Sequence, residues 1–191
     1  VEADDVIATL VSNFSKDKIL ISSPDKDLTQ LVNENVIQHN SMSDIFFDEN
    51  GVKEKFGVFP NKVAELLALV GDKSDNIPGI TKVGEKTAAK WLNEYGSLDE
   101  VIKNAESITG KVGENLREEK NILQRNFFLV SLKNDINLGL QKSDILIPKA
   151  NSSGLQDFYR GLEFKTFIEH EDNKSAGVEY MSVNSLEELR K

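Results

Sequence analysis

The sequence contains no cysteine, which excludes disulfide frameworks, zinc–thiolate sites, iron–sulfur clusters and cysteine nucleophiles. Histidine is nearly absent too: His39 and His170 are the only two, so an imidazole-based zinc site is not expected. We expect both to be ordinary surface or hydrogen-bonded residues. No uninterrupted apolar run approaches the roughly 18 residues of a membrane span. Thiol chemistry, zinc chemistry and a membrane-spanning role are therefore not indicated.

Basic residues are fewer than acidic ones in this sequence. The 191 residues include 23 Lys and Arg against 32 Asp and Glu, which argues against a simple basic nucleic-acid coat protein. The deficit is uneven, because residues 1–76 hold 7 basic and 14 acidic residues whereas residues 77–133 hold 9 and 8. An acidic region is thus followed by a nearly neutral, lysine-bearing one. At 39% hydrophobic residues, the chain is long enough for one sizeable domain or two small ones.

The chain begins at Val1 with neither Met nor a signal segment, and residues 2–5 already resemble the start of a helix. We therefore expect a fragment cut at both ends. Residues 169–177 are polar and low in apolar content, which is typical of a linker. The segment after it begins with a strand-like alternation and a helix start, so a further domain is expected to begin there.

Hydrophobic spacing predicts a helix over residues 3–14, a buried strand at 18–22, a weak helix near 28–32 and a second strand at 36–39. This alternation is typical of a parallel α/β sheet, although two or three strands are too few for a complete one. From residue 50 the pattern is mostly helical, interrupted by a polar loop at 72–78. Helices are predicted at 61–70, closed by Gly71, at 85–95, closed by Gly96, and from 98, with Ser97 as the N-cap. Further helices are predicted at 113–133 and 155–168, with an extended stretch at 136–148.

Seven acidic residues form three clusters: Glu2, Asp4 and Asp5; Asp25 and Asp27; and Asp72 and Asp75. Each has an ordinary structural interpretation, since acids complement helix starts and aspartates cap turns. Their positions favour a site. The second cluster follows a predicted strand, where ligands bind in open parallel sheets, and the first shares one helix face.

Carboxylates brought together repel one another unless hard cations lie among them. All-oxygen ligation suits Mg²⁺ or Mn²⁺, and two such ions would supply four positive charges against seven negative ones. Two-metal nucleases and polymerases hold their ions in this way.

The segment at residues 79–87 resembles a phosphate-binding loop, but Glu85 stands where that pattern requires lysine, and no strand precedes it. A helix-hairpin-helix turn fits better, with Gly79 and Gly84 allowing a tight turn and the next helix directing its N-terminal amides at a phosphate. Lys82 and Lys86 would flank a DNA backbone without reading its sequence. A packing turn with solvated lysines remains the alternative.

Four motifs together, EADD at residues 2–5, SPDKDLTQLV at 23–32, LVGDKSDNIPG at 69–79 and VGEKTA at 83–88, resemble the 5′ nuclease domain of bacterial DNA polymerase I, a relative of flap endonucleases. The resemblance covers residues 1 to about 168. It implies part of a PIN-like α/β metal-binding core followed by a mostly helical helix-hairpin-helix DNA-binding region. It also implies two Mg²⁺ ions, with Mn²⁺ as a substitute.

The resemblance assigns roles by motif. Glu2 and Asp4, with Asp5 nearby, belong to the first metal, and Asp25, Asp27, Asp72 and Asp75 surround the second. It implies catalytic roles for Asp25, Asp27 and Asp75, and a K⁺ ion bound by backbone carbonyls near Ile80 and Val83. The DNA-binding residues it implies are Lys82, Gly84, Lys86 and Thr87.

Two departures from the family pattern qualify this assignment. Pro24 stands where the family often has Gly, and should stiffen the turn. The family's first strand, with its own metal-binding Asp, and its basic arch are expected upstream of Val1, so the isolated fragment is expected to be inactive.

The expected organisation is residues 1–75 as the nuclease core, 76–168 as the DNA-binding region, 169–178 as a linker and 179–191 as the start of a proofreading-type exonuclease domain. The expected function is 5′ to 3′ exonuclease and flap endonuclease activity on DNA and RNA primers, within a monomeric, cytoplasmic, nucleoid-associated DNA polymerase I. A DNA-binding module without activity and a stand-alone 5′ nuclease are the alternatives.

Overall fold

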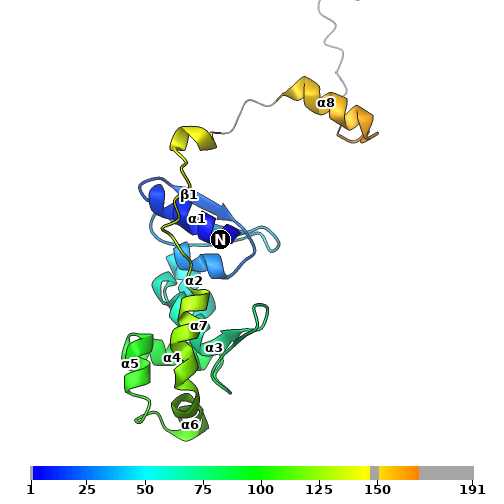
Figure 1. Ribbon diagram of the computed structural model, residues 1–191. Coiled ribbons are helices and arrows are strands. Elements are labelled where there is room, and N and C mark those ends of the chain that lie inside the picture. The colour runs from blue at the N-terminus through cyan, green and yellow to red at the C-terminus, as the bar shows by residue number, and fades with distance from the viewer. Residues whose placement is uncertain (1, 147–150, 168–191) are drawn as a thin grey trace, which may run out of the picture. The chain divides into compact units, whose positions relative to one another are not determined.

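The computed structural model describes residues 2–146 and 151–167 (Figure 1). The chain divides into two compact units, residues 1–139 and 140–191, and each is described by itself. Among the described residues, no helix combines the length and apolar character needed to cross a membrane.

The first unit opens with helix α1 (Ala3–Asn13) and a three-stranded sheet in the order β1-β2-β3. Strands β1 (Ile19–Ser22) and β2 (Val36–Asn40) run parallel, joined by the 3₁₀ helix η1 (Asp27–Leu31). Strand β3 (Ile45–Phe47), which was not predicted, pairs antiparallel with β2. The predicted parallel pair is confirmed, and the weak helix between its strands is a 3₁₀ helix.

The prediction that the first strand is buried was wrong for one face of the sheet. Ile21 is buried, but Leu20 on the opposite face is 60% exposed. Ile37, its register partner on β2, is 41% exposed. Alternate side chains point to opposite faces, and in the described part of the chain only one face of this sheet is covered. An apolar run does not reveal how many faces are covered.

Helices form the rest of the first unit. Three of them, at residues 63–70, 85–95 and from 98, begin within two residues of their predicted starts. The Ser97 side chain caps the third by accepting a hydrogen bond from the Glu100 amide (3.2 Å). The bounds of all these helices are α2 (Glu49–Phe56), η2 (Pro60–Lys62), α3 (Val63–Val70), α4 (Glu85–Tyr95), α5 (Leu98–Lys103), α6 (Gly110–Glu119), η3 (Lys120–Ile122) and α7 (Leu123–Val130).

Helix α3 lies at the centre of the main core because it is apolar on nearly every side. Four consecutive residues, Leu66 to Leu69, are at most 4% exposed, and a helix that is hydrophobic all round is buried. Helices α4 and α7 pack on it. The same core extends from Val32 to Val130, and a smaller cluster including Leu28 and Val36 lies against the sheet.

The single long helix predicted over residues 113–133 was wrong: the turn η3 separates α6 from α7. The redirection lets α6 contact the turn before α4, where the Glu119 carboxylate accepts from the Thr81 amide (2.7 Å) and Asn115 donates to the Thr81 carbonyl (2.6 Å). Asn126 on α7 packs against α3 instead. Tertiary contacts here outweigh the local helical pattern.

The polar loop predicted at residues 72–78 is a small hairpin. Strand β4 (Gly71–Asp72) pairs antiparallel with β5 (Ile77–Pro78). The Asp72 carboxylate accepts hydrogen bonds from the amide and hydroxyl of Ser74 (2.8 and 2.5 Å), which tightens the turn between them.

The end of the first unit returns along α1. The Lys133 amide donates to the Asp5 carboxylate (3.0 Å), and the Thr9 hydroxyl accepts from the Ile136 amide (3.3 Å). Gln30 donates to the carbonyl of Val130 (2.9 Å). These bonds join residues at least 100 positions apart, and they fix α1 to the segment after α7 and η1 to the last residue of α7.

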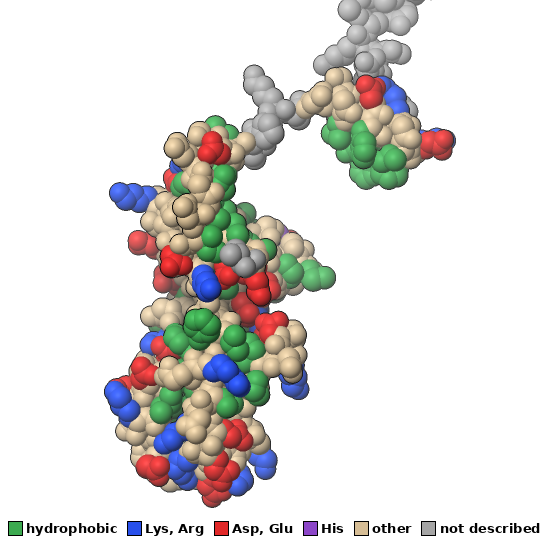
Figure 2. All heavy atoms as spheres, in the orientation of Figure 1, with side chains coloured by type: hydrophobic (Ala, Val, Ile, Leu, Met, Phe, Trp, Pro, Cys, Tyr) green, Lys and Arg blue, Asp and Glu red, His purple; other side chains and the backbone are tan. Residues whose placement is uncertain are grey.

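The second unit contains the 3₁₀ helix η4 (Lys142–Ile145) and helix α8 (Ser152–Gly161). The described part of the stretch predicted as extended, residues 136–146, forms no strand. Apolar side chains gather on one side of α8 and the turn after it (Figure 2). Phe158 on α8 is 58% exposed. The predicted linker, the domain start after it and His170 lie outside the described residues.

Candidate metal centre

Asp27 is placed by the turn that follows β1. The Asp25 carboxylate accepts a hydrogen bond from the Asp27 amide (2.9 Å), so the two aspartates form an Asx-type turn that leads into η1. The Asp25 amide in turn donates to the Ser23 hydroxyl (3.1 Å). The loop predicted at the carboxyl end of the strand is therefore ordered by its own side chains.

Asp72 and Asp75 are placed by the β4–β5 hairpin. Asp72 is 4% exposed on β4, while Asp75 lies in the exposed turn beyond it. Gly71 allows strand β4 to lie close to the end of β5. Its φ is +77°, and a Cβ there would lie 2.2 Å from the Gly79 nitrogen. A side chain at either glycine would push the two arms of the hairpin apart.

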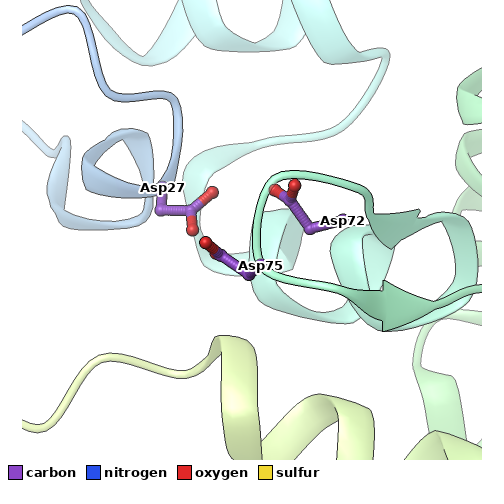
Figure 3. Close-up of side chains that lie close together, drawn as sticks. All are labelled: Asp27, Asp72 and Asp75. Atoms are coloured by element: carbon purple, nitrogen blue, oxygen red, sulfur yellow. The ribbon is translucent and has the colours of Figure 1, made fainter.

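Three carboxylates converge between these loops. One carboxylate oxygen from each of Asp27, Asp72 and Asp75 lies within 4.8 Å of the others (Figure 3). They line a groove of about 450 Å³ together with Asp25, Lys26 and Ser74. Residues more than 40 positions apart in sequence therefore form one acidic site.

The charges in this site oppose one another. Burial and the neighbouring charge of Asp25 raise the pKa of Asp27 to about 6. The Oδ1 atom of Asp27 is buried and accepts no hydrogen bond from any described residue. A buried carboxylate oxygen without a partner suits a hard cation, so the donor set fits a divalent metal.

Lys26 neutralises part of the site. Its ammonium lies 2.5 Å from the Asp72 carboxylate. Burial would raise the pKa of Asp72, but hydrogen bonds from Lys26 and Ser74 outweigh it and lower that pKa to about 2. Sequence reasoning did not single out Lys26, although it stands between Asp25 and Asp27 in the motif at residues 23–32.

The N-terminal acidic cluster lies near the site but is not part of the close group. Burial, followed by the charge of Asp25, raises the pKa of Asp4, and Asp75 contributes as well. Asp5 makes structural bonds instead: it accepts from the amides of Lys133 (3.0 Å) and Glu2 (3.4 Å). The hydrogen bond from Lys133 lowers the pKa of Asp5. Glu2 caps α1.

His39 is the described histidine of the two. It stacks on Phe46 with ring centroids 4.4 Å apart, and its Nε2 lies 2.8 Å from the Asp44 carboxylate. This confirms the expectation of a hydrogen-bonded histidine on the sheet surface.

The turn before α4 is held by apolar side chains. Ile80 and Val83 are 2% and 6% exposed, and the Val83 amide donates to the Ile80 carbonyl (3.0 Å). Gly79 allows a close approach, since a Cβ there would lie 1.9 Å from the Val70 carbonyl oxygen, but neither Gly79 nor Gly84 has a positive φ, and that of Gly84 is −108°. Lys82 takes the left-handed conformation instead, with φ of +65°.

Gly84 nevertheless has a distinctive environment. A Cβ at this position would meet nothing within 4 Å, and no side chain caps the helix that Gly84 precedes. Lys86 in the first turn of α4 is exposed and Thr87 is half-buried. The open backbone beside uncapped amides is compatible with close approach of an anion.

Family comparisons agree with this fold. Residues 1–57 match the family described as 5′-3′ exonuclease, N-terminal resolvase-like domain, and residues 58–153 match 5′-3′ exonuclease, C-terminal SAM fold. The chain therefore belongs to the 5′-3′ exonuclease family, and its mixed α/β region followed by helices is that family's fold.

Individual relatives include stand-alone and fused proteins. The chain is 43% identical over 173 residues to a 5′-3′ exonuclease of Aquifex aeolicus, covering 90% of this chain and 59% of the relative. It is 41% identical over 171 residues to a DNA polymerase I of Mycobacterium leprae, covering 86% of this chain and 19% of the relative. The chain thus spans less than two thirds of the length of the first relative and about a fifth of the second.

A solved structure of the T5 5′-exonuclease with divalent zinc ions is also similar. Its TM-score is 0.65 at 28% identity, covering 70% of this chain and 51% of that one. A T5 flap endonuclease in a pseudo-enzyme-product complex with DNA and metal ions matches equally well, with a TM-score of 0.65 at 27% identity, covering 70% of this chain and 50% of that one.

Proposed function

We propose that this chain is the metal-binding and DNA-binding portion of a 5′ to 3′ exonuclease and flap endonuclease. The convergence of Asp27, Asp72 and Asp75 from two loops carries the proposal. Support comes from the T5 relatives, whose structures hold divalent metals and, in one, DNA. The substrates would be DNA with 5′ ends or flaps, and RNA primers.

The proposed cofactor is a pair of Mg²⁺ ions, with Mn²⁺ as a substitute. Such ions would activate water and stabilise the leaving oxygen of the phosphodiester. Asp27, Asp72 and Asp75 would hold one ion, with Asp25 beside them. Glu2 and Asp4 would help to hold the other, and Asp5 would support them through the start of α1. The carboxylates bind metal; none is proposed as the nucleophile.

For DNA, we propose contacts at the turn and first residues of α4. Exposed Lys82 and Lys86 lie on either side of Gly84, where the backbone is open, and Thr87 follows in the same helical turn. Uncapped amides at a helix start favour a phosphate. K⁺ bound near the carbonyls of Ile80 and Val83 would join this turn to the DNA backbone.

Polymerase and proofreading domains in the parent chain, a monomeric state and a cytoplasmic, nucleoid-associated location are part of the same proposal, and the DNA polymerase I relatives support the first of these.

The decisive experiment is Mg²⁺-dependent cleavage of a labelled 5′-flap duplex. The 191-residue chain is compared with a protein extended upstream to the relatives' length. We expect cleavage by the extended protein and none by the fragment. Cleavage by neither would contradict the nuclease proposal.

A second candidate, DNA binding without cleavage by the isolated chain, is favoured by one observation. Only three of the seven predicted ligands converge, and Asp72 among them is already paired with Lys26. Flap binding by the 191-residue chain in the absence of metal would support it.

A further inference from the structure

Two buried carboxamides lie at the bases of the two acidic loops. Gln38 on β2 is 1% exposed, and its Nε2 donates to the carbonyls of Ser23 (3.0 Å) and Asp25 (2.5 Å). One side chain thus holds both ends of the short segment between β1 and the Asx turn. The backbone that carries Asp25 and presents Asp27 is fixed from beneath by β2.

Asn126 holds the β4–β5 hairpin in the same way, by donating to two backbone carbonyls. It lies on α7 with no exposed surface, and its Nδ2 donates to the carbonyls of Ala68 (3.1 Å) and Pro78 (2.6 Å). Ala68 lies near the end of α3, which leads into β4, and Pro78 closes β5. Asn126 therefore joins the two arms that carry Asp72 and Asp75.

Stability alone does not explain why amides occupy these positions. The oxygen of each carboxamide, Oε1 of Gln38 and Oδ1 of Asn126, is buried and accepts no hydrogen bond from any described residue. An unsatisfied buried oxygen costs about as much as two ordinary hydrogen bonds contribute. What the amides provide is a fixed separation between carbonyls that belong to different segments.

We propose that Gln38 and Asn126 are positioning residues of the metal site, which set the two acidic loops at the spacing where Asp27, Asp72 and Asp75 share one cation. This inference rests on the proposed metal-binding function. Groups that orient metal ligands without touching the metal commonly change metal affinity by about 10- to 100-fold when removed.

The test measures Mn²⁺ affinity of the full 191-residue chain by electron paramagnetic resonance, alongside its unfolding temperature. Gln38→Met and Asn126→Leu retain side-chain volume but lose both donors. We expect each to weaken Mn²⁺ binding by about tenfold. The unfolding temperature should also fall, because the backbone carbonyls that lose their donors are left unpaired, so binding is compared with that of an equally destabilised control.

Val36→Ala is the matched control, since Val36 is fully buried on the same strand and the same sheet face as Gln38 but makes no side-chain bond to the loop. It should lower the unfolding temperature and leave Mn²⁺ affinity within about twofold, because deleting core methyl groups acts on packing. An equal loss of affinity in Val36→Ala would overturn the positioning role in favour of a purely structural one.

A second measurement needs no substitution and covers the case in which a variant does not fold. In the wild-type chain, the carboxamide protons of Gln38 and Asn126 are followed by NMR during titration with Mg²⁺. They should shift on the same binding curve as the loop amides at residues 72–75. Carboxamide signals that do not move while the loop amides do would overturn the inference.

The outcomes separate the two proposals. Unchanged Mn²⁺ binding in both variants, with wild-type binding intact, overturns the positioning role and leaves the proposed function standing. Absence of Mn²⁺ binding by the wild-type chain contradicts the metal site, and the positioning role is overturned with it.

Discussion

The acidic loops and the turn before α4 lie in the same unit but are held by different forces. Asp27 and Asp72 are held by hydrogen bonds and one ion pair, and they oppose one another electrostatically. Ile80 and Val83, by contrast, are buried apolar side chains that anchor the turn, and the carboxylate bonded to it, Glu119, accepts from the Thr81 amide. In the acidic loops, carboxylate repulsion lowers stability, and the proposed cation would relieve it. The turn before α4 is stable without a ligand, and only its backbone and lysines are left to bind one.

The largest expected effect, on flap cleavage, comes from removing two negative charges from the acidic loops. Asp25→Asn together with Asp27→Asn, in the upstream-extended protein, should reduce flap cleavage by at least about 100-fold because two ligand charges are lost. Flap binding should persist, since the α4 turn is untouched. Retained cleavage in a labelled-flap assay would remove these residues from the site.

The second largest effect should come from a substitution at Gly79, where the two arms of the β4–β5 hairpin lie closest together. Gly79→Ala would place a Cβ 1.9 Å from the Val70 carbonyl oxygen, so the backbone must shift. We expect a loss of about 2 kcal/mol or more in the free energy of unfolding, measured by urea denaturation. Gly84→Ala is the control: open space surrounds that position, so the free energy of unfolding should fall by about 1 kcal/mol or less, the difference between Gly and Ala at a helix N-cap.

Lys86→Ala tests the ligand role of the turn before α4. In the upstream-extended protein it should weaken flap binding about equally for all sequences and reduce the slope of log affinity against log salt by about 1. The unfolding temperature should stay unchanged because Lys86 is exposed. A loss confined to particular DNA sequences would contradict a phosphate contact.

Lys26→Met removes a positive charge from the acidic loops, whereas the aspartate substitutions remove negative ones. The Lys26 ammonium pairs with Asp72, so a metal must displace it or share the carboxylate with it. Removing this positive charge should strengthen Mn²⁺ binding several-fold, as followed by electron paramagnetic resonance. Weaker binding would instead show that Lys26 supports the metal-bound arrangement.

The smallest expected effect is a pH dependence of the metal-free protein. The pKa of Asp27 is raised to about 6 in the folded chain, above the roughly 3.9 of an unfolded aspartate. The folded state then binds the extra proton, so this contribution to stability is present below about pH 4 and is lost as the pH rises through about 6. Urea titrations across this range should show a decline that Asp27→Asn flattens.

Local pattern was enough for much of the helical region. Apolar spacing and the Gly71, Gly96 and Ser97 end signals predicted helices that the structure confirms, because these signals act within one or two turns. The local pattern did not predict the break within residues 113–133, where Glu119 and Asn115 bond to Thr81 and the chain turns at η3. Such bonds depend on a partner more than 30 positions away.

For the site, residue type and order determined the chemistry. Carboxylates without cysteine indicate a hard cation, and four motifs in order indicate the nuclease family that the comparisons show. The family resemblance grouped Asp27, Asp72 and Asp75 around one metal, whereas only the tertiary structure set their separation. It alone also decided that Asp5 binds Lys133 and that Lys26 pairs with Asp72. The reason is physical: a sequence states which charges exist, but their energies depend on distance and burial, which only packing sets.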